Sequence, residues 1–451
     1  MSSETTPTSR KKPRKIWKSE PELRFPNFEN QADWAEVRLV DVADKKVRWS
    51  FVGGPFGSNL KSSDYTEHGV RIIQLQNIGD GEFQNDYQIF TTKQKADELI
   101  SCNIYPGDII LSKMGNPVGR ACLIPDIHER YLMCSDGIRL VIDEEKNNKY
   151  YIFSLVNSKS FRKLVENTAT GSTRKRIGLD HLRNLLLTTP GKKEQQKIAD
   201  CLSSIDDRIT AETQKLDTLK AHKKGLMQQL FPVEGESVPK RRFRKFKKQW
   251  GETVLSKFIN LQSGYAFKSE YFSEKGEKLL IPKNFTKTGY AHFSDENTKY
   301  TTEEYDARYV CRKGDLLLLL TDLTPSCELL GRPLLLTESD GNVLLNQRIA
   351  RVIVKKEINL RFLLYLFSTA SFRKRIINTA TGSTVRHSSN KIVLSTKIRI
   401  PEIPDEQQEV ADCLSVLDEV IAAQTQKLNK LKYHKKGLMQ QLFPSLDEAK
   451  R

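Results

Sequence analysis

A long internal repeat constrains the fold of this chain more than any other feature of its sequence. The segment Glu194–Pro232, "EQQKIADCLSSIDDRITAETQKLDTLKAHKKGLMQQLFP", aligns without gaps with Glu406–Pro444, "EQQEVADCLSVLDEVIAAQTQKLNKLKYHKKGLMQQLFP". Of these 39 positions, 28 are identical. Upstream, Ser160–Thr173 matches Ser371–Thr384, and the match thins towards the N-terminus. The chain is therefore a tandem duplication, whose halves share one task at their ends and differ in their bodies.

The repeated segment predicts a long helix with one apolar seam. Apolar side chains recur at alternating steps of four and three, once the polar positions Glu212 and Lys223 and their copies Gln424 and Lys435 are included. Such a heptad pattern faces a partner helix, and the polar positions can fix its register. The proline that closes each copy ends the helix, which gives a rod of roughly 55 Å. The predicted seam consists of Ile198, Leu202, Ile205, Ile209, Leu216, Leu219, Leu226, Leu230, Val410, Leu414, Leu417, Ile421, Leu428, Leu431, Leu438 and Leu442.

Two arrangements of these helices are compatible with the pattern. Each helix could lie on its own domain, or the two could pack on each other. The matching seams favour the second arrangement, and a pseudo-two-fold relation between the halves would make the helices antiparallel, with one body at each end. The face outside the seam is repeated as well, and we interpret it as a docking surface for two identical partners. The predicted docking residues are Met227, Phe231, Met439 and Phe443.

Each body mixes short strands with few helices. Strands are predicted at Val70–Ile78, Gly107–Met114 and Gly137–Asp143, with counterparts at Lys278–Phe285, Gly314–Thr321 and Arg348–Lys355. One helix follows in each body, at Tyr150–Asn167 and Leu360–Asn378. We therefore predict an α+β chain, with two α/β domains of one fold related by pseudo-two-fold symmetry and separated by two long antiparallel coiled-coil helices.

The predicted boundaries follow from the repeat. Residues 1–20 form a disordered basic tail, 21–190 the first domain, 191–232 the first spacer helix, 233–403 the second domain, 404–444 the second spacer helix, and 445–451 a short tail. No apolar run approaches the roughly 18 residues that span a bilayer, and the N-terminus lacks the apolar stretch of a secretory signal. The seven cysteines are scattered without a CxxC pair, which indicates reduced thiols and a cytoplasmic protein rather than a zinc site.

The charge of the chain indicates a polyanionic partner. Its formal net charge is +17, and basic and amide side chains gather in the predicted turns of both bodies. Arg, Gln and Asn can read guanine and adenine edges, whereas Lys, Ser and Thr commonly hold phosphates. Any one of them could be an ordinary solvated loop residue, but their recurrence in corresponding loops favours DNA. The candidates are Lys61, Ser62, Gln74, Gln76, Asn77, Lys113, Asn116, Arg120, Ser172, Thr173, Arg174, Lys175, Arg176, Lys268, Lys283, Asn284, Lys287, Gln347, Arg348, Ser383, Thr384, Arg386 and His387.

The repeated "TATGST" beside these basic residues has two interpretations. It could be a plain turn whose Ser or Thr caps the next element. Alternatively, Gly171 and Gly382 could let backbone amides approach a phosphate. The sequence supports both equally.

Motifs that would indicate catalysis are missing. The chain has no P-loop, no glycine-rich cofactor loop, no HExxH and no nucleophile elbow. The fragments "PD" at Pro125–Asp126 and "EEK" at Glu144–Lys146 superficially resemble a metal-nuclease pattern, but the second half lacks them. We therefore expect no catalytic residue, metal or cofactor in this chain, and keep a nuclease only as an alternative.

Two variable bodies, each followed by a near-identical helix that opens with "EQQ" and closes with "HKKGLMQQLFP", closely resemble the specificity (S) subunits of type I restriction–modification systems. The resemblance covers about Pro21 to Pro444. It implies two target recognition domains and a non-catalytic role in host defence against foreign DNA. It also implies two methyltransferase (M) subunits that methylate adenine at N6, and restriction (R) subunits. S-adenosylmethionine, ATP and Mg would belong to those partners.

The bodies differ while the helices match, so we predict an asymmetric, bipartite double-stranded DNA target with one half-site per domain. Because a rod of roughly 55 Å exceeds one DNA turn of about 34 Å, an uncontacted spacer should separate the half-sites. Phosphate contacts should make binding strongly salt-dependent. The remaining alternative is a coiled-coil scaffold without DNA recognition.

Overall fold

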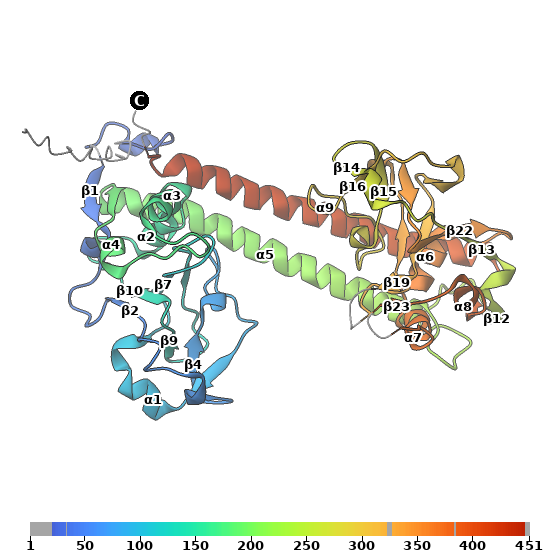
Figure 1. The fold of residues 1–451 in the computed structure, drawn as a ribbon, viewed down its shortest axis with the longest axis horizontal. Coiled ribbons are helices and arrows are strands. Elements are labelled where there is room, and N and C mark those ends of the chain that lie inside the picture. The colour runs from blue at the N-terminus through green and yellow to red at the C-terminus, as the bar shows by residue number, and fades with distance from the viewer. Residues whose placement is uncertain (1–19, 33, 323–326, 383–384, 447–451) are drawn as a thin grey trace, which may run out of the picture. The chain divides into compact units, whose positions relative to one another are not determined.

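The chain divides into two compact units in the computed structural model, which describes residues 20–32, 34–322, 327–382 and 385–446 (Figure 1). Unit 1 contains the described residues up to Glu212 together with those from Lys427 onwards, and unit 2 contains Thr213–Gln426. Each long helix thus contributes one end to each unit. The predicted tails lie largely outside the described residues, although Leu446 is buried in the core of unit 1.

Unit 1 is built on two small sheets. The first has the strand order β2-β10-β7-β8 and is antiparallel throughout. The second has the order β3-β5-β4-β9-β6, in which β4 and β9 are parallel. A separate pair, β1 and β11, is antiparallel. The strands are β1 (Ala35–Arg38), β2 (Phe51–Gly53), β3 (Tyr65–Thr66), β4 (Val70–Ile73), β5 (Ile89–Thr91), β6 (Asn103–Ile104), β7 (Ile109–Ser112), β8 (Ala121–Leu123), β9 (Tyr131–Met133), β10 (Gly137–Leu140) and β11 (Leu186–Thr189).

Unit 2 repeats this topology. Its four-stranded sheet has the order β13-β22-β18-β20, and its five-stranded sheet has the order β14-β16-β15-β21-β17 with β15 and β21 parallel. Two further pairs are β12 with β24 and β19 with β23. The strands are β12 (Gly251–Val254), β13 (Ile259–Ser263), β14 (Phe272–Ser273), β15 (Glu277–Leu280), β16 (Lys299–Thr301), β17 (Val310–Cys311), β18 (Leu316–Leu319), β19 (Thr321–Asp322), β20 (Pro333–Leu335), β21 (Val343–Leu345), β22 (Ile349–Val354), β23 (Arg386–His387) and β24 (Lys397–Ile400).

The helix predicted after the strands of each body is two helices. The backbone breaks where Ser158 accepts a hydrogen bond from the Phe161 amide, and where Thr369 accepts one from the Phe372 amide. Each hydroxyl caps a new helix, so a polar residue inside an apolar pattern marks a start that the periodicity conceals. The helices are α1 (Lys93–Glu98), α2 (Lys149–Val156), α3 (Lys159–Thr168), α4 (Leu179–Arg183), α5 (Lys192–Leu230), α6 (Leu360–Ser368), α7 (Ala370–Asn378), α8 (Asn390–Leu394) and α9 (Pro404–Leu442).

The long helices take part in the main core of each unit. In unit 1, Ile198 and Leu202 of α5 and Leu442 of α9 share one apolar cluster with α2 and the antiparallel sheet. In unit 2, Leu226 and Leu230 of α5 share a cluster with the N-terminal turns of α9. Every residue of the predicted seam is buried or half-buried. A second cluster in each unit lies at the five-stranded sheet. The seven cysteines are free.

Candidate nucleic-acid interface

The glutamate that opens each repeat is a buried anchor for the segment preceding its body. In unit 1, Arg24 donates from Nε and Nη2 to the two carboxylate oxygens of Glu194, at 2.9 and 3.0 Å. In unit 2, Arg242 donates to Glu406 at 2.6 and 2.7 Å, and Trp250 Nε1 adds a third hydrogen bond at 3.0 Å. The bond to Glu406 raises the pKa of Arg242. This fork geometry needs both an Arg and a carboxylate, which explains why the glutamate occurs in both copies.

The glutamine that follows ties the long helix to its body. Gln195 accepts a hydrogen bond from the Asn148 amide at 2.9 Å and donates to the Pro190 carbonyl at 2.9 Å. Gln407 makes the same bonds to Asn359 and Pro401, at 3.0 and 3.1 Å. Asn148 and Asn359 cap the N-termini of α2 and α6. The "EQQ" motif is therefore a structural joint.

Each unit contains a short antiparallel contact between the two long helices. In unit 1, Lys435 of α9 pairs with Asp206 of α5 at 2.6 Å, and Lys427 pairs with Glu212. In unit 2, Lys223 of α5 pairs with Asp418 of α9. Lys223 and Lys435 occupy the same position in the repeat, as do Asp206 and Asp418. The same contact thus occurs once in each unit, with the roles of α5 and α9 exchanged. This is expected when polar seam positions fix the register of the helices.

A tyrosine completes each of these polar contacts. Tyr150 of α2 donates to Asp206, and Tyr365 of α6 donates to Asp418 at 2.7 Å. Burial raises the pKa of both phenols, and the neighbouring carboxylate raises it further. Both tyrosines are therefore neutral donors that satisfy partly buried carboxylates.

The chain entering each body also contacts the end of the other long helix. The amide of Leu23 donates to the Gln441 carbonyl at 3.0 Å in unit 1, and the amide of Arg241 donates to the Gln229 carbonyl at 2.9 Å in unit 2. These carbonyls lie in the last turn of a helix, where no intrahelical donor is available. Leu23 and Arg241 correspond in the alignment of the two halves.

The docking residues predicted on the repeat are packed inwards. Phe231 is 4% exposed and Phe443 is 1% exposed, against Phe362 and Tyr151 respectively. Met227 and Met439 are half-buried against the same cores. The docking prediction is therefore wrong for the two phenylalanines, because each body covers the helix end next to its seam. The exposed part of the repeat is instead polar, and consists of His222, Lys224, Gln228 and Gln229 with their copies His434, Lys436, Gln440 and Gln441.

Predicted DNA-binding residues of unit 1 gather along one edge, around the turn that follows β9. The Cys134 amide at the start of this turn donates to the Ile73 carbonyl at the end of β4, at 2.9 Å. The Lys113 amide at the end of β7 donates to the Asp136 carbonyl at 2.7 Å. The loop after β7 also touches residues 170–176, since the Gly115 amide donates to the Lys175 carbonyl. This edge brings together Gln74, Gln76, Lys113, Asn116, Ser172, Thr173, Arg174, Lys175 and Arg176.

Unit 2 forms the same edge from corresponding backbone positions. The Leu320 amide donates to the Arg348 carbonyl at 3.0 Å, and the Ser388 amide donates to the Leu320 carbonyl at 2.9 Å. The parallel pairing of β15 with β21 places the turn after β15 beside the turn after β21. His387 Nδ1 lies 2.8 Å from Thr321 Oγ1. The predicted residues on this edge are Lys283, Gln347, Arg348, Arg386 and His387, whereas Ser383 and Thr384 lie outside the described residues.

The "TATGST" segment closes a tight hairpin in unit 1, and its described part in unit 2, up to Gly382, makes the same closing backbone bonds. Thr170 and Arg176 exchange backbone hydrogen bonds of 2.9 and 2.8 Å, and Thr381 and His387 exchange bonds of 3.0 and 2.9 Å. Gly171 has φ +103°, and a Cβ there would lie 2.7 Å from the Arg174 carbonyl oxygen. The hairpin's own closure thus requires the glycine. The motif is therefore a turn, but its Ser and Thr do not cap the next helix, since α4 begins after Gly178 without a side-chain cap and α8 is capped by Ser389. The phosphate interpretation stays a prediction.

Asn77 and Asn284 are structural residues rather than candidate DNA contacts. Both are 0% exposed. Asn77 Nδ2 donates to the carbonyls of Gln84 and Tyr87 at 2.9 and 2.8 Å, and its Oδ1 accepts from the Gln74 amide. Asn284 makes the equivalent contacts in unit 2. Their prediction as DNA-binding residues is wrong, because the amides that could read a base already hold the turn after the strand.

The other predicted residues lie beside these edges or have intramolecular partners. Lys61 and Ser62 are exposed near Tyr65, which accepts a hydrogen bond from Gln74 at 3.1 Å. Lys287 pairs with Glu328 at 2.6 Å, and Lys268 lies 3.8 Å from Glu270. Arg120 is half-buried, and its Nε is buried without a partner among the described residues. Ser135 and Asp136 on the edge of unit 1 are not predicted by the sequence, because neither is a basic or amide residue.

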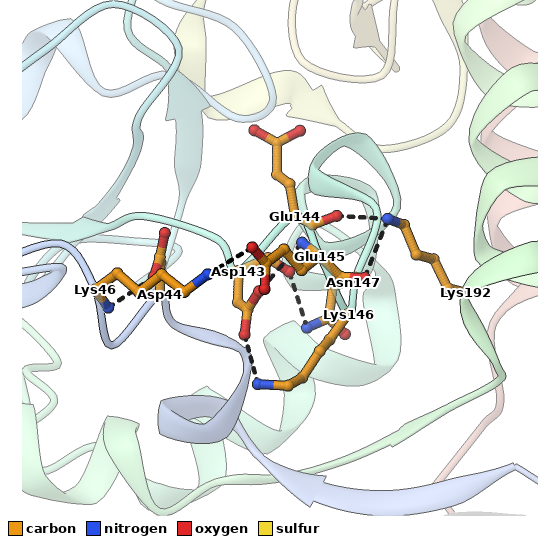
Figure 2. Close-up of polar contacts among 8 residues, drawn as sticks. All are labelled: Asp44, Lys46, Asp143, Glu144, Glu145, Lys146, Asn147 and Lys192. Atoms are coloured by element: carbon orange, nitrogen blue, oxygen red, sulfur yellow. Dashed lines mark hydrogen bonds and ion pairs between the residues drawn. The ribbon is translucent and has the colours of Figure 1, made fainter.

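The "EEK" fragment lies in a surface loop that is held by one contact within the loop and by lysines from two distant segments (Figure 2). Lys146 donates to the Asp143 carboxylate at 2.8 Å, which lowers the pKa of Asp143. Lys192 donates to the Glu144 carbonyl, and Lys46 pairs with Glu145. Asp126 is exposed in a different loop, between β8 and β9. Among the described residues, no three His, Cys, Asp or Glu side chains could hold a metal ion, and no described helix is long and apolar enough to cross a membrane.

Two units of one topology, each with a basic and amide edge, define a DNA-recognition protein with two related domains. The family model "Type I restriction modification DNA specificity domain" matches residues 31–221 and 247–433. The chain therefore belongs to the type I restriction–modification specificity family. It is a specificity subunit with two DNA specificity domains, a non-catalytic DNA-recognition component that acts with other restriction–modification subunits.

Curated relatives and solved structures agree with this assignment. The type I restriction enzyme MjaVIII specificity subunit of Methanocaldococcus jannaschii is 26% identical over 397 residues, which cover 81% of this chain and 87% of that protein. The putative MjaX specificity subunit of the same organism is 21% identical, over 83% of this chain and 86% of that protein.

The fold is shared with solved specificity subunits. The S subunit of a type I system from M. genitalium has a TM-score of 0.54 at 17% identity and covers 95% of this chain and all of that chain, 100%. A chain from a structural study of complex assembly and conformational transition in a type I system has a TM-score of 0.52 at 15% identity, over 90% of this chain and 96% of that chain.

Proposed function

We propose that this subunit directs its complex to an asymmetric, bipartite DNA target, with one half-site read by each unit. The observation that carries the proposal is the pair of equivalent edges with different side chains. Where unit 1 has Gln76, unit 2 has Lys283 at the same position of the turn after the strand. Where unit 1 has Asp136, unit 2 has Arg348. Equivalent backbones with different donors and acceptors would read different bases.

The bipartite target can be tested in the host genome. Methylated adenines would be mapped by sequencing with and without this gene. The expected result is one gene-dependent motif made of two unlike half-sites separated by a fixed number of unspecified bases. A gene-dependent motif that is continuous or palindromic would contradict the proposal, and so would a footprint of the assembled complex without protected half-sites.

We further infer that two methyltransferase subunits dock on the duplicated helices, and that restriction subunits join the complex in the cytoplasm. The support is the polar face of "HKKGLMQQLFP", which is exposed and identical in both copies. In unit 2 this face borders a groove of about 660 Å³, lined by His222 and Leu226 of α5 and by Val416 and Leu417 of α9. Val416 is 57% exposed there. Val420, one helical turn further along α9, is 42% exposed. Neighbouring exposed apolar side chains on one helix face are typical of a partner surface.

The docking surface can be tested by reversing charge on its exposed lysines. The double substitution Lys224→Glu and Lys436→Glu should abolish co-purification of the methyltransferase subunit, while the melting temperature of the chain stays unchanged, because both lysines are exposed. The single substitutions should each leave one subunit bound, as measured by light scattering. The matched control is Lys430→Glu, on an exposed position of α9 that is Thr218 in the other copy. Full assembly by the double variant would refute this surface.

A further inference from the structure

The turn that follows β9 in unit 1 and the turn that follows β21 in unit 2 are held in the same way. In unit 1 the Gly54 amide donates to the Gly137 carbonyl at 2.8 Å, and in unit 2 the Gly264 amide donates to the Ile349 carbonyl at 3.1 Å. A Cβ on Gly54 would lie 1.7 Å from the Cys134 carbonyl oxygen, and a Cβ on Gly264 would lie 2.2 Å from that of Asn346. A glycine therefore passes directly against each turn and supports its backbone. We name Ser135–Asp136 and Gln347–Arg348 the recognition turns.

The register of the neighbouring strands makes these turns equivalent residue by residue. Gly137 pairs with Ser112 in unit 1, and Ile349 pairs with Leu319 in unit 2. The carbonyls of Asp136 and Arg348 then accept from the next amide of the adjacent strand. Positions 136 and 348 thus present their side chains from one common backbone geometry.

The segment next to each recognition turn is closed in the same way, because Thr170 bonds to Arg176 in unit 1 and Thr381 bonds to His387 in unit 2. Arg176 forms a backbone bridge with Met114, and His387 pairs with Thr321, each at the end of the strand that borders the turn. Positions 176 and 387 therefore correspond. Unit 1 has Asp at the turn and Arg on the hairpin, whereas unit 2 has Arg at the turn and His on the hairpin. At these two corresponding positions each unit has one arginine. It lies on the hairpin in unit 1 and on the recognition turn in unit 2.

The two arginines differ in how they are held. Arg176 donates from Nη2 to Asp136 Oδ1 at 2.5 Å, and its side chain remains 51% exposed while that of Asp136 is 18% exposed. The side chain of Arg348 is half-buried and has no ion-pair partner among the described residues. A carboxylate facing DNA would be repelled by phosphates, so Asp136 is best explained as a support for the guanidinium. Fixing the fork in advance reduces the entropy lost on binding.

We propose that Arg176 and Arg348 each contact a guanine in their own half-site, and that Asp136 is a positioning residue for Arg176. This inference rests on the proposed function. The fork of an Arg matches O6 and N7 of guanine in the major groove, which is the commonest specific contact to a base. Because the arginines project from different elements, the guanines occupy different positions within the two half-sites. Gln347, exposed beside Arg348, faces the adjacent base pair.

The test is to measure sequence preference of the fully assembled methyltransferase complex on a library with both half-sites randomised. Arg348→Ala should reduce the preference for guanine by about 10- to 100-fold at one position of one half-site. Arg176→Ala should do the same at one position of the other half-site. In each variant the untouched half-site is an internal control for folding. Arg174→Ala, on the exposed tip of the same hairpin, should weaken binding to all sequences without changing preference.

Asp136→Asn tests the positioning role. It should lower guanine preference at the Arg176 position by a smaller factor, and should have no additional effect in an Arg176→Ala background. A merely structural role would instead lower complex stability in both backgrounds. Uniform weakening in the Arg176 and Arg348 variants, with all preferences intact, would overturn the inference and leave the proposed function standing. A wild-type library without any bipartite preference would overturn both.

Discussion

The buried carboxylate of Glu406 permits the most quantitative prediction. Glu406→Ala removes the acceptor of hydrogen bonds from Arg242 at 2.6 and 2.7 Å and from Trp250 at 3.0 Å. Glu406 is 1% exposed, and breaking a buried ion pair costs about 3–5 kcal/mol. Arg242 lies at the margin of the site and would regain water. We therefore expect Glu406→Ala to lower the free energy of unfolding by about 3 kcal/mol. For a cooperative unit of roughly 200 residues this lowers the melting temperature by about 6–12 °C.

The assay is scanning calorimetry of the full-length chain, with Glu409→Ala as the matched control. Glu409 lies three residues further along α9 and pairs with Lys245, whose side chain is 61% exposed. Such a surface pair contributes about 0–1 kcal/mol, so the control should melt within about 4 °C of the wild type. Glu194→Ala should cost about 1 kcal/mol less than Glu406→Ala, because it removes one hydrogen bond fewer. A Glu406→Ala protein that melts with the control would refute the anchoring role.

Three further predictions concern the helix contact, the turn after β4 and the hairpin. Lys223→Met leaves Asp418 without its cation and should lower the free energy of unfolding by about 1–3 kcal/mol, whereas the exposed Lys224→Met should change it by less than about 0.5 kcal/mol; equal melting temperatures would contradict this. Asn77→Ala should lower the free energy of unfolding, measured with denaturant, by about 2–3 kcal/mol and leave the recognised DNA sequence unchanged. A change in the recognised DNA sequence would show that Asn77 contacts DNA after all. Gly171→Ala should strain the hairpin by about 1–3 kcal/mol and weaken DNA binding by the complex in a filter assay, and unaltered affinity would place the hairpin away from DNA.

The sequence alone predicted the duplication, the long helices and the α+β bodies, because these depend on patterns along the chain. A heptad seam requires only the spacing of apolar residues, and a strand only a short apolar run between turns. The broken helix in each body was missed, because the caps Ser158 and Thr369 interrupt a continuous apolar pattern without changing its period. The edge loops were found by composition, since basic and amide residues cluster there.

Only the tertiary structure decided which residues of those patterns are available for function. Periodicity defines the seam, but not the second face of each helix that a body covers, so it wrongly predicts Phe231 and Phe443 as docking residues. Composition could not separate Asn77 from Gln76. The side-chain amide of Asn77 is buried and hydrogen-bonded within its own turn, whereas Gln76 is exposed. It also gave no reason to select Asp136, because a carboxylate gains a role at a DNA edge only beside Arg176. Such roles depend on hydrogen bonds between residues distant in the chain, and no local pattern encodes them.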